Sequence, residues 1–261
     1  MIFNILLIAL VLTTGVLVSS LMLWILLKRA IRFRQAVGLI CIAKAMNKFF
    51  LTGSGYAAAS GSLKIEGFPF YKSLSSFTVF ELFSALPWLV MGIYFGAKLS
   101  FKVPVFLMIF LALIPAFFIY KRVKLMPFLK DALGYIRQIK YNIYMILPLV
   151  LINVFISTVY YLLLFKAFGF QSSILNIFKI VSIAFTIGYF SPTPAGLGFK
   201  EGGLIFLLMQ HKLSFAESAT IAVSDRLAVT GFYAILAFAF GMNIIRAFIK
   251  KKFNNQEEGK Q

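Results

Sequence analysis

The sequence predicts an all-α, polytopic integral membrane protein with two re-entrant, broken-helix hairpins in inverted repeats. Of the 261 residues, 61% are hydrophobic and 13% are charged, so no segment is polar enough for a soluble domain. The net charge is +18, and the cations cluster beside apolar runs. Cytoplasmic loops that face anionic lipid headgroups have this pattern. We therefore expect a multi-pass protein of the cell membrane and no nucleic-acid partner.

The apolar runs predict a single transmembrane domain over residues 1–261. The runs that are long enough and nearly free of charge for a full span are 1–27, 73–95, 101–120, 141–165 and 215–245.

These spans divide the domain into two repeat halves, residues 1–120 and 141–245. Between the halves, residues 121–140 form a basic segment that we expect at the membrane interface. Residues 246–261 follow the last span, begin with several cations, and are expected to be a cytoplasmic tail.

Two shorter helical segments are each followed by a break. Residues 35–51 are interrupted by Lys44 and Lys48, and the small-residue-rich run 52–62 is expected to break that helix, with a turn at 52–55. Residues 173–190 are apolar and stop at a run rich in proline and glycine. Both segments are too short and too broken to be good full spans.

The positions of the cations predict how these short segments enter the membrane. If Arg34 and Lys121 are both cytoplasmic, an even number of crossings separates them. Two full spans already lie between them, so residues 35–51 must enter the membrane and return on the same side. The same count from Lys140 to the C-terminal cations requires residues 173–213 to return on the outer side. The two hairpins are therefore expected to have opposite orientations.

The two halves also match in the order of their segments. GFPFYKSLSSFTVFEL in the first half corresponds to HKLSFAESATIAVSDR in the second, which places Glu81 opposite Arg226 or, after a one-residue shift, opposite Asp225. Inverted repeats of this kind place substrates near the midplane of the bilayer, at discontinuous helices.

The second break has the composition of an anion site. Pro194 lacks a backbone N–H, and Gly196 and Gly198 allow turns that other residues resist. A new helix is predicted to begin near Phe199, where unpaired N–H groups and the helix dipole favour an anionic group beside Lys200. A surface turn has a similar composition, so both interpretations stay open.

Charged residues on either side of this break are expected to pair. Asp225 and Arg226 are neighbours in the chain and therefore lie about 100° apart around a helix. Charges inside a membrane domain face its interior and pair, so at least one of the two should contact Lys200 or Glu201. A clamp for folding and a role in transport both fit such a pair.

Residues 194–227, PAGLGFKEGGLIFLLMQHKLSFAESATIAVSDRL, resemble the second signature of the lysylphosphatidylglycerol synthase transmembrane, or flippase-like, family, which has a PGGLGxRE core. Lys200 stands where that family usually has Arg, Glu201 falls on its Glu, and Arg226 falls on the Arg of the following helix. Residues 52–55 lie where the family tends to have Pro, Gly, Arg and a Gly-Glu pair. The layout is similar over nearly the whole chain.

The resemblance implies movement of an aminoacylated or glycosylated lipid, anionic or zwitterionic, between leaflets. Its partners would be membrane lipids with anionic headgroups and a separate glycosyltransferase or aminoacyl-lipid synthase. The residues expected to bind substrate are Pro194, Gly196, Gly198, Lys200, Glu201, Asp225, Arg226 and Glu81. A non-transporting accessory subunit of a lipid- or glycan-modifying enzyme is the alternative.

The residue inventory gives little support to an enzyme. His211 is the only histidine, the HExxH zinc motif is missing, and an aspartate pair would have to use Asp131 and Asp225. Cys41 is the only cysteine, which excludes a disulfide within the chain and a cysteine-rich metal site. We therefore expect no catalytic residue, no metal and no cofactor.

Overall fold

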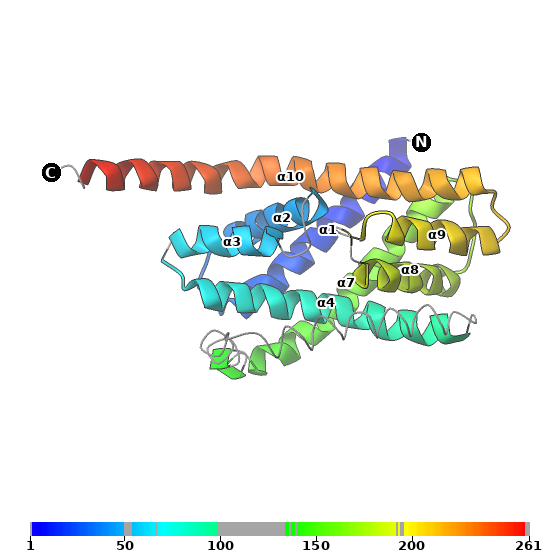
Figure 1. Cartoon of the computed structure of the whole chain (residues 1–261), viewed down its shortest axis with the longest axis horizontal. Helices are drawn as coiled ribbons and strands as arrows, with labels where there is room; N and C mark the ends of the chain where they lie inside the picture. The colour runs from blue at the N-terminus through cyan, green and yellow to red at the C-terminus, as the bar shows by residue number, and fades with distance from the viewer. Residues whose placement is uncertain are drawn as a thin grey trace.

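The computed structural model is all-helical in the part of the chain that it describes (Figure 1). That part comprises residues 2–49, 54–65, 67–98, 134–135, 137–138, 140–191, 193 and 196–258. The helices are α1 (Ile2–Leu26), α2 (Phe33–Phe49), α3 (Ser54–Ile65), α4 (Phe70–Lys98), α7 (Lys140–Ala167), α8 (Ile174–Tyr189), α9 (Phe199–Gln210) and α10 (Phe215–Glu258).

Four of these helices are long and apolar enough to cross a membrane. The candidate spans are Asn4–Leu26 in α1, Phe70–Ala97 in α4, Asn142–Ala167 in α7 and Phe215–Phe240 in α10. They agree with four of the predicted spans, so the chain has the helices of a membrane protein. The predicted span at 101–120 and most of the basic segment at 121–140 lie outside the described residues.

The last helix is longer than its membrane span. Helix α10 has 44 residues and continues to Glu258, through most of the segment predicted as a tail. Residues 242–258 contain neither proline nor glycine, so nothing in the sequence ends the helix after the apolar part.

The predicted break after residues 35–51 is present, since α2 ends at Phe49 and a separate helix, α3, begins at Ser54, but the predicted turn at 52–55 was wrong for Ser54 and Gly55. Residues from Ser54 onward belong to α3, and only the positions before it lie outside the described residues. Gly55 explains why small residues occur here, since a Cβ atom on it would overlap the backbone carbonyl of Ala43 in α2. Small residues let two helix backbones approach closely, so this segment serves packing as a helix.

Two pairs of short helices lie between two long ones. Figure 1 shows α2 with α3 and α8 with α9 on opposite sides of the space between α10 and α4, while α1 and α7 cross the bundle obliquely. One buried cluster, with Met22, Phe77 and Phe80 among its members, joins the first pair to its neighbours. A second cluster, which includes Trp88 and Phe165, does the same for the other pair. The region between the two clusters holds the candidate site.

Candidate functional site

A cavity of about 260 Å³ lies between the two buried clusters. Tyr56 and Phe80 from the first cluster line it, together with Trp88, Tyr160 and Tyr161 from the second. Concave sites of this kind, with mostly apolar and aromatic walls and a few polar groups, are where proteins bind small ligands.

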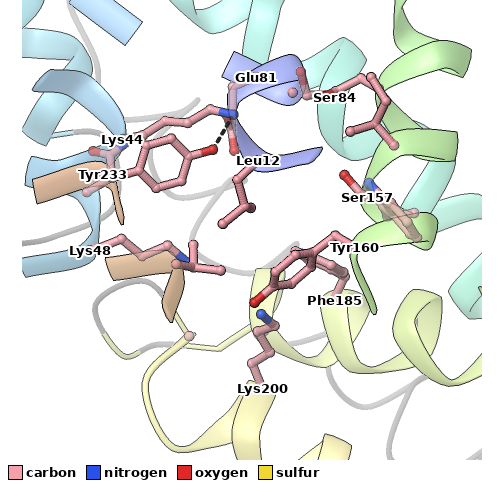
Figure 2. A pocket seen from close by; sticks show the side chains of 18 of the residues that line it. Leu12, Lys44, Lys48, Glu81, Ser84, Ser157, Tyr160, Phe185, Lys200 and Tyr233 are labelled. Carbon is pink, nitrogen blue, oxygen red and sulfur yellow. Dashed lines mark hydrogen bonds between the residues drawn. The ribbon is translucent and has the colours of Figure 1, made fainter. Parts of the chain in front are cut away.

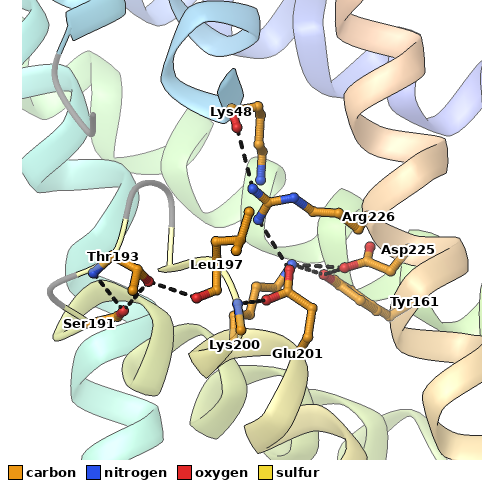
Figure 3. Close-up of polar contacts among 10 residues, drawn as sticks. Lys48, Tyr161, Ser191, Thr193, Leu197, Lys200, Glu201, Asp225 and Arg226 are labelled. Atoms are coloured by element: carbon orange, nitrogen blue, oxygen red, sulfur yellow. Dashed lines mark hydrogen bonds and ion pairs between the residues drawn. The ribbon is translucent and has the colours of Figure 1, made fainter. Parts of the chain in front are cut away.

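Lys200 and Asp225 form a buried ion pair at one wall of this cavity (Figure 3). Lys200 Nζ lies 2.8 Å from Asp225 Oδ2 and donates to the Tyr161 hydroxyl at 2.8 Å. Tyr160 and Tyr161 donate to the two carboxylate oxygens of Asp225 at 3.0 and 3.1 Å. The Lys200 ammonium also lies 4.6 Å from the centre of the Phe185 ring, a favourable cation–π distance. Both charges are therefore paired and hydrogen-bonded within the chain.

A second ion pair lies beside the first. Arg226 Nη1 contacts Glu201 Oε1 at 3.1 Å, and Arg226 Nη2 donates to the backbone carbonyl of Lys48 at 3.3 Å. Glu201 Oε2 accepts the backbone N–H of Gly198 at 2.8 Å. The prediction that Asp225 or Arg226 contacts Lys200 or Glu201 is confirmed, and both residues do so.

The predicted break between the helices is present. Helix α8 ends at Tyr189 and α9 begins at Phe199, as the sequence indicates. Gly196 and Gly198 have φ angles of 70° and 82°, in the left-handed region that favours glycine. Pro194 lies outside the described residues.

The start of α9 already has an anionic neighbour from the chain itself. The carboxylate of Glu201 accepts the Gly198 N–H, in the manner of a capping box. The Lys200 side chain does not remain at the break, because it reaches Asp225 in α10. The binding of a headgroup at this helix start stays a prediction, and Lys200 and Gly196 contribute to the cavity wall as well.

Two further lysines line the cavity from α2 (Figure 2). Lys44 Nζ donates to the Ser19 hydroxyl at 3.2 Å and to the Tyr233 hydroxyl at 3.3 Å, which are both neutral groups. Within the described part of the chain, Lys48 Nζ has no hydrogen-bond acceptor. The described ion pairs involve neither lysine. The α2 wall therefore carries two cations that no acid of the described chain neutralises at contact distance.

Glu81 is the one carboxylate that the described structure places on the cavity wall. It accepts a hydrogen bond from the hydroxyl of Tyr56 in α3. The predicted site residue Glu81 therefore faces the same cavity as Lys200, although no described contact joins Glu81 to Asp225 or Arg226. The charged side chains of the wall are three lysines and this glutamate.

Sequence reasoning missed the contribution of α2. Lys44, Asn47 and Lys48 were treated as interruptions of an apolar helix, but their spacing of three and four residues places them on one helix face. That spacing is the signal from which a polar wall was predictable.

The described residues contain no group of three His, Cys, Asp or Glu side chains arranged to hold a metal ion. The chemical features of the site are therefore its cations, its hydroxyl and amide groups, and its aromatic rings. No family model, no curated protein and no solved structure matches this chain.

Proposed function

We propose that this protein binds the anionic or zwitterionic headgroup of a membrane lipid in the cavity and moves the lipid between leaflets. The observation that carries the proposal is the pair of lysines, Lys44 and Lys48, which face the cavity from α2 without an acidic partner among the described residues. A cation near the bilayer centre costs about 2.5 to 3.5 kcal/mol on insertion scales, and such residues mark substrate pathways. A phosphate group in the cavity offsets that cost.

In the same proposal, α2–α3 and α8–α9 are two re-entrant hairpins in inverted repeats. Helices α3 and α9 have 12 residues each. At about 1.5 Å per residue each is about 18 Å long, too short for a hydrocarbon core of about 30 Å. Both pairs border the cavity, the position at which inverted repeats hold substrate.

The resemblance to the flippase-like family is part of the proposal and rests on the residues around Lys200, Glu201 and Arg226. In this view the protein is a multi-pass protein of the cell membrane. It receives an aminoacylated or glycosylated lipid from a separate synthase or glycosyltransferase.

An accessory subunit without transport is the second candidate. The observation that favours it is that Lys200, Asp225, Glu201 and Arg226 satisfy one another within the chain. Charged side chains that pair with one another within the chain can serve to join helices, and they do not require a substrate as a partner.

The decisive experiment measures the exposure of labelled lipid headgroups in proteoliposomes. We expect wild type to exchange an anionic phospholipid between leaflets, and Lys48→Gln to lose most of that activity because it removes the unpaired cation. Lys64→Gln is the matched control, since Lys64 is exposed on α3 and is not part of the cavity wall. Gly196→Leu tests the break, because a side chain there meets the carbonyl of Gly188.

Two outcomes separate the candidates. Equal headgroup exposure in wild-type and empty vesicles, for aminoacylated, glycosylated and ordinary anionic lipids, supports the accessory subunit. Exchange that is equally fast in wild type and Lys48→Gln contradicts the proposed role of the α2 cations.

Labelling of introduced cysteines tests the topology. In a Cys41→Ser background, cysteines near Lys28 and Lys251 should react from the cytoplasm, and those near Lys98 and Gly169 from outside. Reaction at Lys251 from outside contradicts the second re-entrant hairpin.

A further inference from the structure

The cavity has a second wall that is polar but neutral. Asn153 and Ser157 lie one turn apart on α7 and line the cavity together with Ser84 of α4. In Figure 2, Ser84 and Ser157 lie across the cavity from Lys44 and Lys48. The site therefore has a cationic side on α2 and, at Ser84, Asn153 and Ser157, a neutral wall, beside which Glu81 of α4 is the one described carboxylate.

The hydrogen-bonding groups of this neutral wall lack partners in the described part of the chain. The Ser84 hydroxyl is buried without a hydrogen bond. Asn153 and Ser157 also make no described side-chain hydrogen bond, whereas Thr158, next in sequence, bonds the carbonyl of Val154 in the usual helical way. Polar groups that face a cavity without a partner from the chain are available to hydrogen-bond a ligand.

The charges of the wall restrict what that ligand can be. Asp225 pairs with Lys200, and Glu81 accepts a hydrogen bond from Tyr56. Lys44 and Lys48 are left facing the cavity, and Glu81, one turn from Ser84 on α4, is the one described carboxylate of its wall, so cations outnumber carboxylates there. A headgroup with net positive charge, such as a lysylated one, is therefore disfavoured, and a phosphate is favoured.

We infer that the headgroup carried in this cavity is a phosphate joined to an uncharged, hydroxyl-rich group, a sugar or a polyol. The phosphate lies against Lys48 and Lys44, and the hydroxyl groups exchange hydrogen bonds with Ser84, Asn153 and Ser157. Hydroxyl groups are both donors and acceptors, as the amide and hydroxyl groups of that wall require. Aromatic side chains, among them Trp88 and Tyr160, also line the cavity. This inference rests on the proposed function and specifies its substrate.

The chain provides its own probe of binding. It has two tryptophans. Trp88 lines the cavity, whereas Trp24 donates its ring N–H to the carbonyl of Ile31 and is not part of the cavity wall. The full chain with Trp24→Phe therefore reports on the cavity through the fluorescence of Trp88 alone.

The experiment titrates this protein in detergent with five probes. Phosphatidylinositol carries both features, phosphatidic acid only the phosphate, and glucosyl diacylglycerol only the hydroxyl groups. Lysyl-phosphatidylglycerol has a net positive headgroup. Glucose 1-phosphate is soluble and combines a phosphate with a hydroxyl-rich group, as phosphatidylinositol does, but has no lipid tail. We expect phosphatidylinositol to bind about tenfold more tightly than the two lipids with one feature, since each wall then adds its hydrogen bonds.

Two sets of substitutions assign the features to the walls. Lys48→Gln should weaken the binding of phosphatidylinositol and phosphatidic acid about tenfold, and it should leave the affinity for glucosyl diacylglycerol unchanged. The double variant Asn153→Leu with Ser157→Ala should weaken the binding of phosphatidylinositol and glucosyl diacylglycerol, but not the binding of phosphatidic acid. Thr78→Val is the control, because Thr78 is an exposed α4 residue whose hydroxyl bonds its own helix.

Each other result has a definite meaning. Equal binding of phosphatidic acid and phosphatidylinositol overturns the role of the neutral wall, and tighter binding of lysyl-phosphatidylglycerol overturns the charge argument. Either leaves lipid transport in place. Equal binding of glucose 1-phosphate and phosphatidylinositol supports the ligand chemistry and overturns the lipid function. No response to any probe, together with no lipid exchange in vesicles, overturns both.

Discussion

The two short-helix pairs place lysines on the cavity in different states. On the α8–α9 side, Lys200 is held by Asp225 and by a tyrosine hydroxyl. On the α2–α3 side, Lys44 contacts neutral hydroxyls, and Lys48 has no described hydrogen bond from its ammonium group. A charge in an apolar domain therefore indicates a ligand only where the protein itself supplies no partner of opposite charge. By that measure the α8–α9 charges are satisfied within the chain, and the α2 lysines are the charges on which the proposed substrate binding rests.

The pairs share one packing device despite this difference. Gly55 lies against the backbone of Ala43 at the α2–α3 junction, and Gly196 lies against the backbone of Gly188 at the α8–α9 junction. A close backbone approach at each junction brings the short helices of a pair together. The two helix pairs are thus alike in how their backbones pack, and they differ in whether their lysines have an acidic partner.

The largest effect on stability should come from breaking the buried ion pair of Lys200 and Asp225. Asp225→Asn leaves the buried Lys200 ammonium without its counter-ion, which should lower the free energy of unfolding by about 3 to 5 kcal/mol. Thermal unfolding in detergent measures the change.

The double variant Lys200→Met with Asp225→Leu is the control, because removing both charges should restore most of the stability. An Asp225→Asn protein as stable as wild type contradicts the assignment of a structural role to the α8–α9 charges.

The next largest effect on stability should come from substituting Gly55 and Gly196, the glycines at which the backbones of each helix pair approach closely. Gly55→Ala and Gly196→Ala should each destabilise the protein by about 1 to 3 kcal/mol, because the added methyl group meets backbone atoms. Gly61→Ala and Gly202→Ala are matched controls, since a Cβ atom there meets nothing within 4 Å. Chemical or thermal unfolding should show the controls unchanged or slightly stabilised, and equal losses at all four positions contradict the prediction.

A smaller effect is expected from the partly buried pair of Arg226 and Glu201. The variants Arg226→Gln and Glu201→Gln and the double variant form a cycle in which the coupling free energy should be about 1.5 kcal/mol. Glutamine keeps an oxygen that can accept the Gly198 N–H, so the cap of α9 is retained. A coupling free energy near zero shows that the two side chains do not interact in solution.

The smallest loss of stability should come from Lys48→Gln. Its ammonium group has no described partner to lose, and removing the charge removes its insertion cost of about 2.5 to 3.5 kcal/mol, so the free energy of unfolding should not fall. The same variant should lose lipid exchange, which separates function from folding. A loss of stability comparable to that of Asp225→Asn would show that Lys48 also belongs to the scaffold.

Local sequence signals predicted the second pair better than the first. Glycines and prolines mark the break before Phe199, and adjacent charges at Asp225 and Arg226 indicate partners nearby, so both the break and the ion pairs were predictable. Residues 52–62 were predicted less well, because the break is present but Ser54 and Gly55 of the predicted turn belong to α3. Glycine and alanine occur in turns and in tightly packed membrane helices alike, and only the neighbouring Ala43 backbone decides between the two.

The cationic wall was harder to predict than the ion pairs. The spacing of Lys44 and Lys48 shows that they share a helix face, but it does not show what that face meets. In a membrane domain the lipid-facing and protein-facing sides of a helix are both apolar, so the usual contrast between them is weak. For the same reason, the sequence did not indicate that Asn153 and Ser157 face the cavity. They lie in a span without any charged neighbour.

Helix α10 joins the two sides mechanically. It carries Asp225, which holds Lys200, and Tyr233, which contacts Lys44, and these two residues are about 12 Å apart along the axis of one helix. Helices transmit displacement along their length because their backbone hydrogen bonds resist stretching. A slide or roll of α10 therefore changes the Lys200 contact and the Lys44 contact in the same movement. One helix therefore carries the partners of a lysine from each side of the cavity.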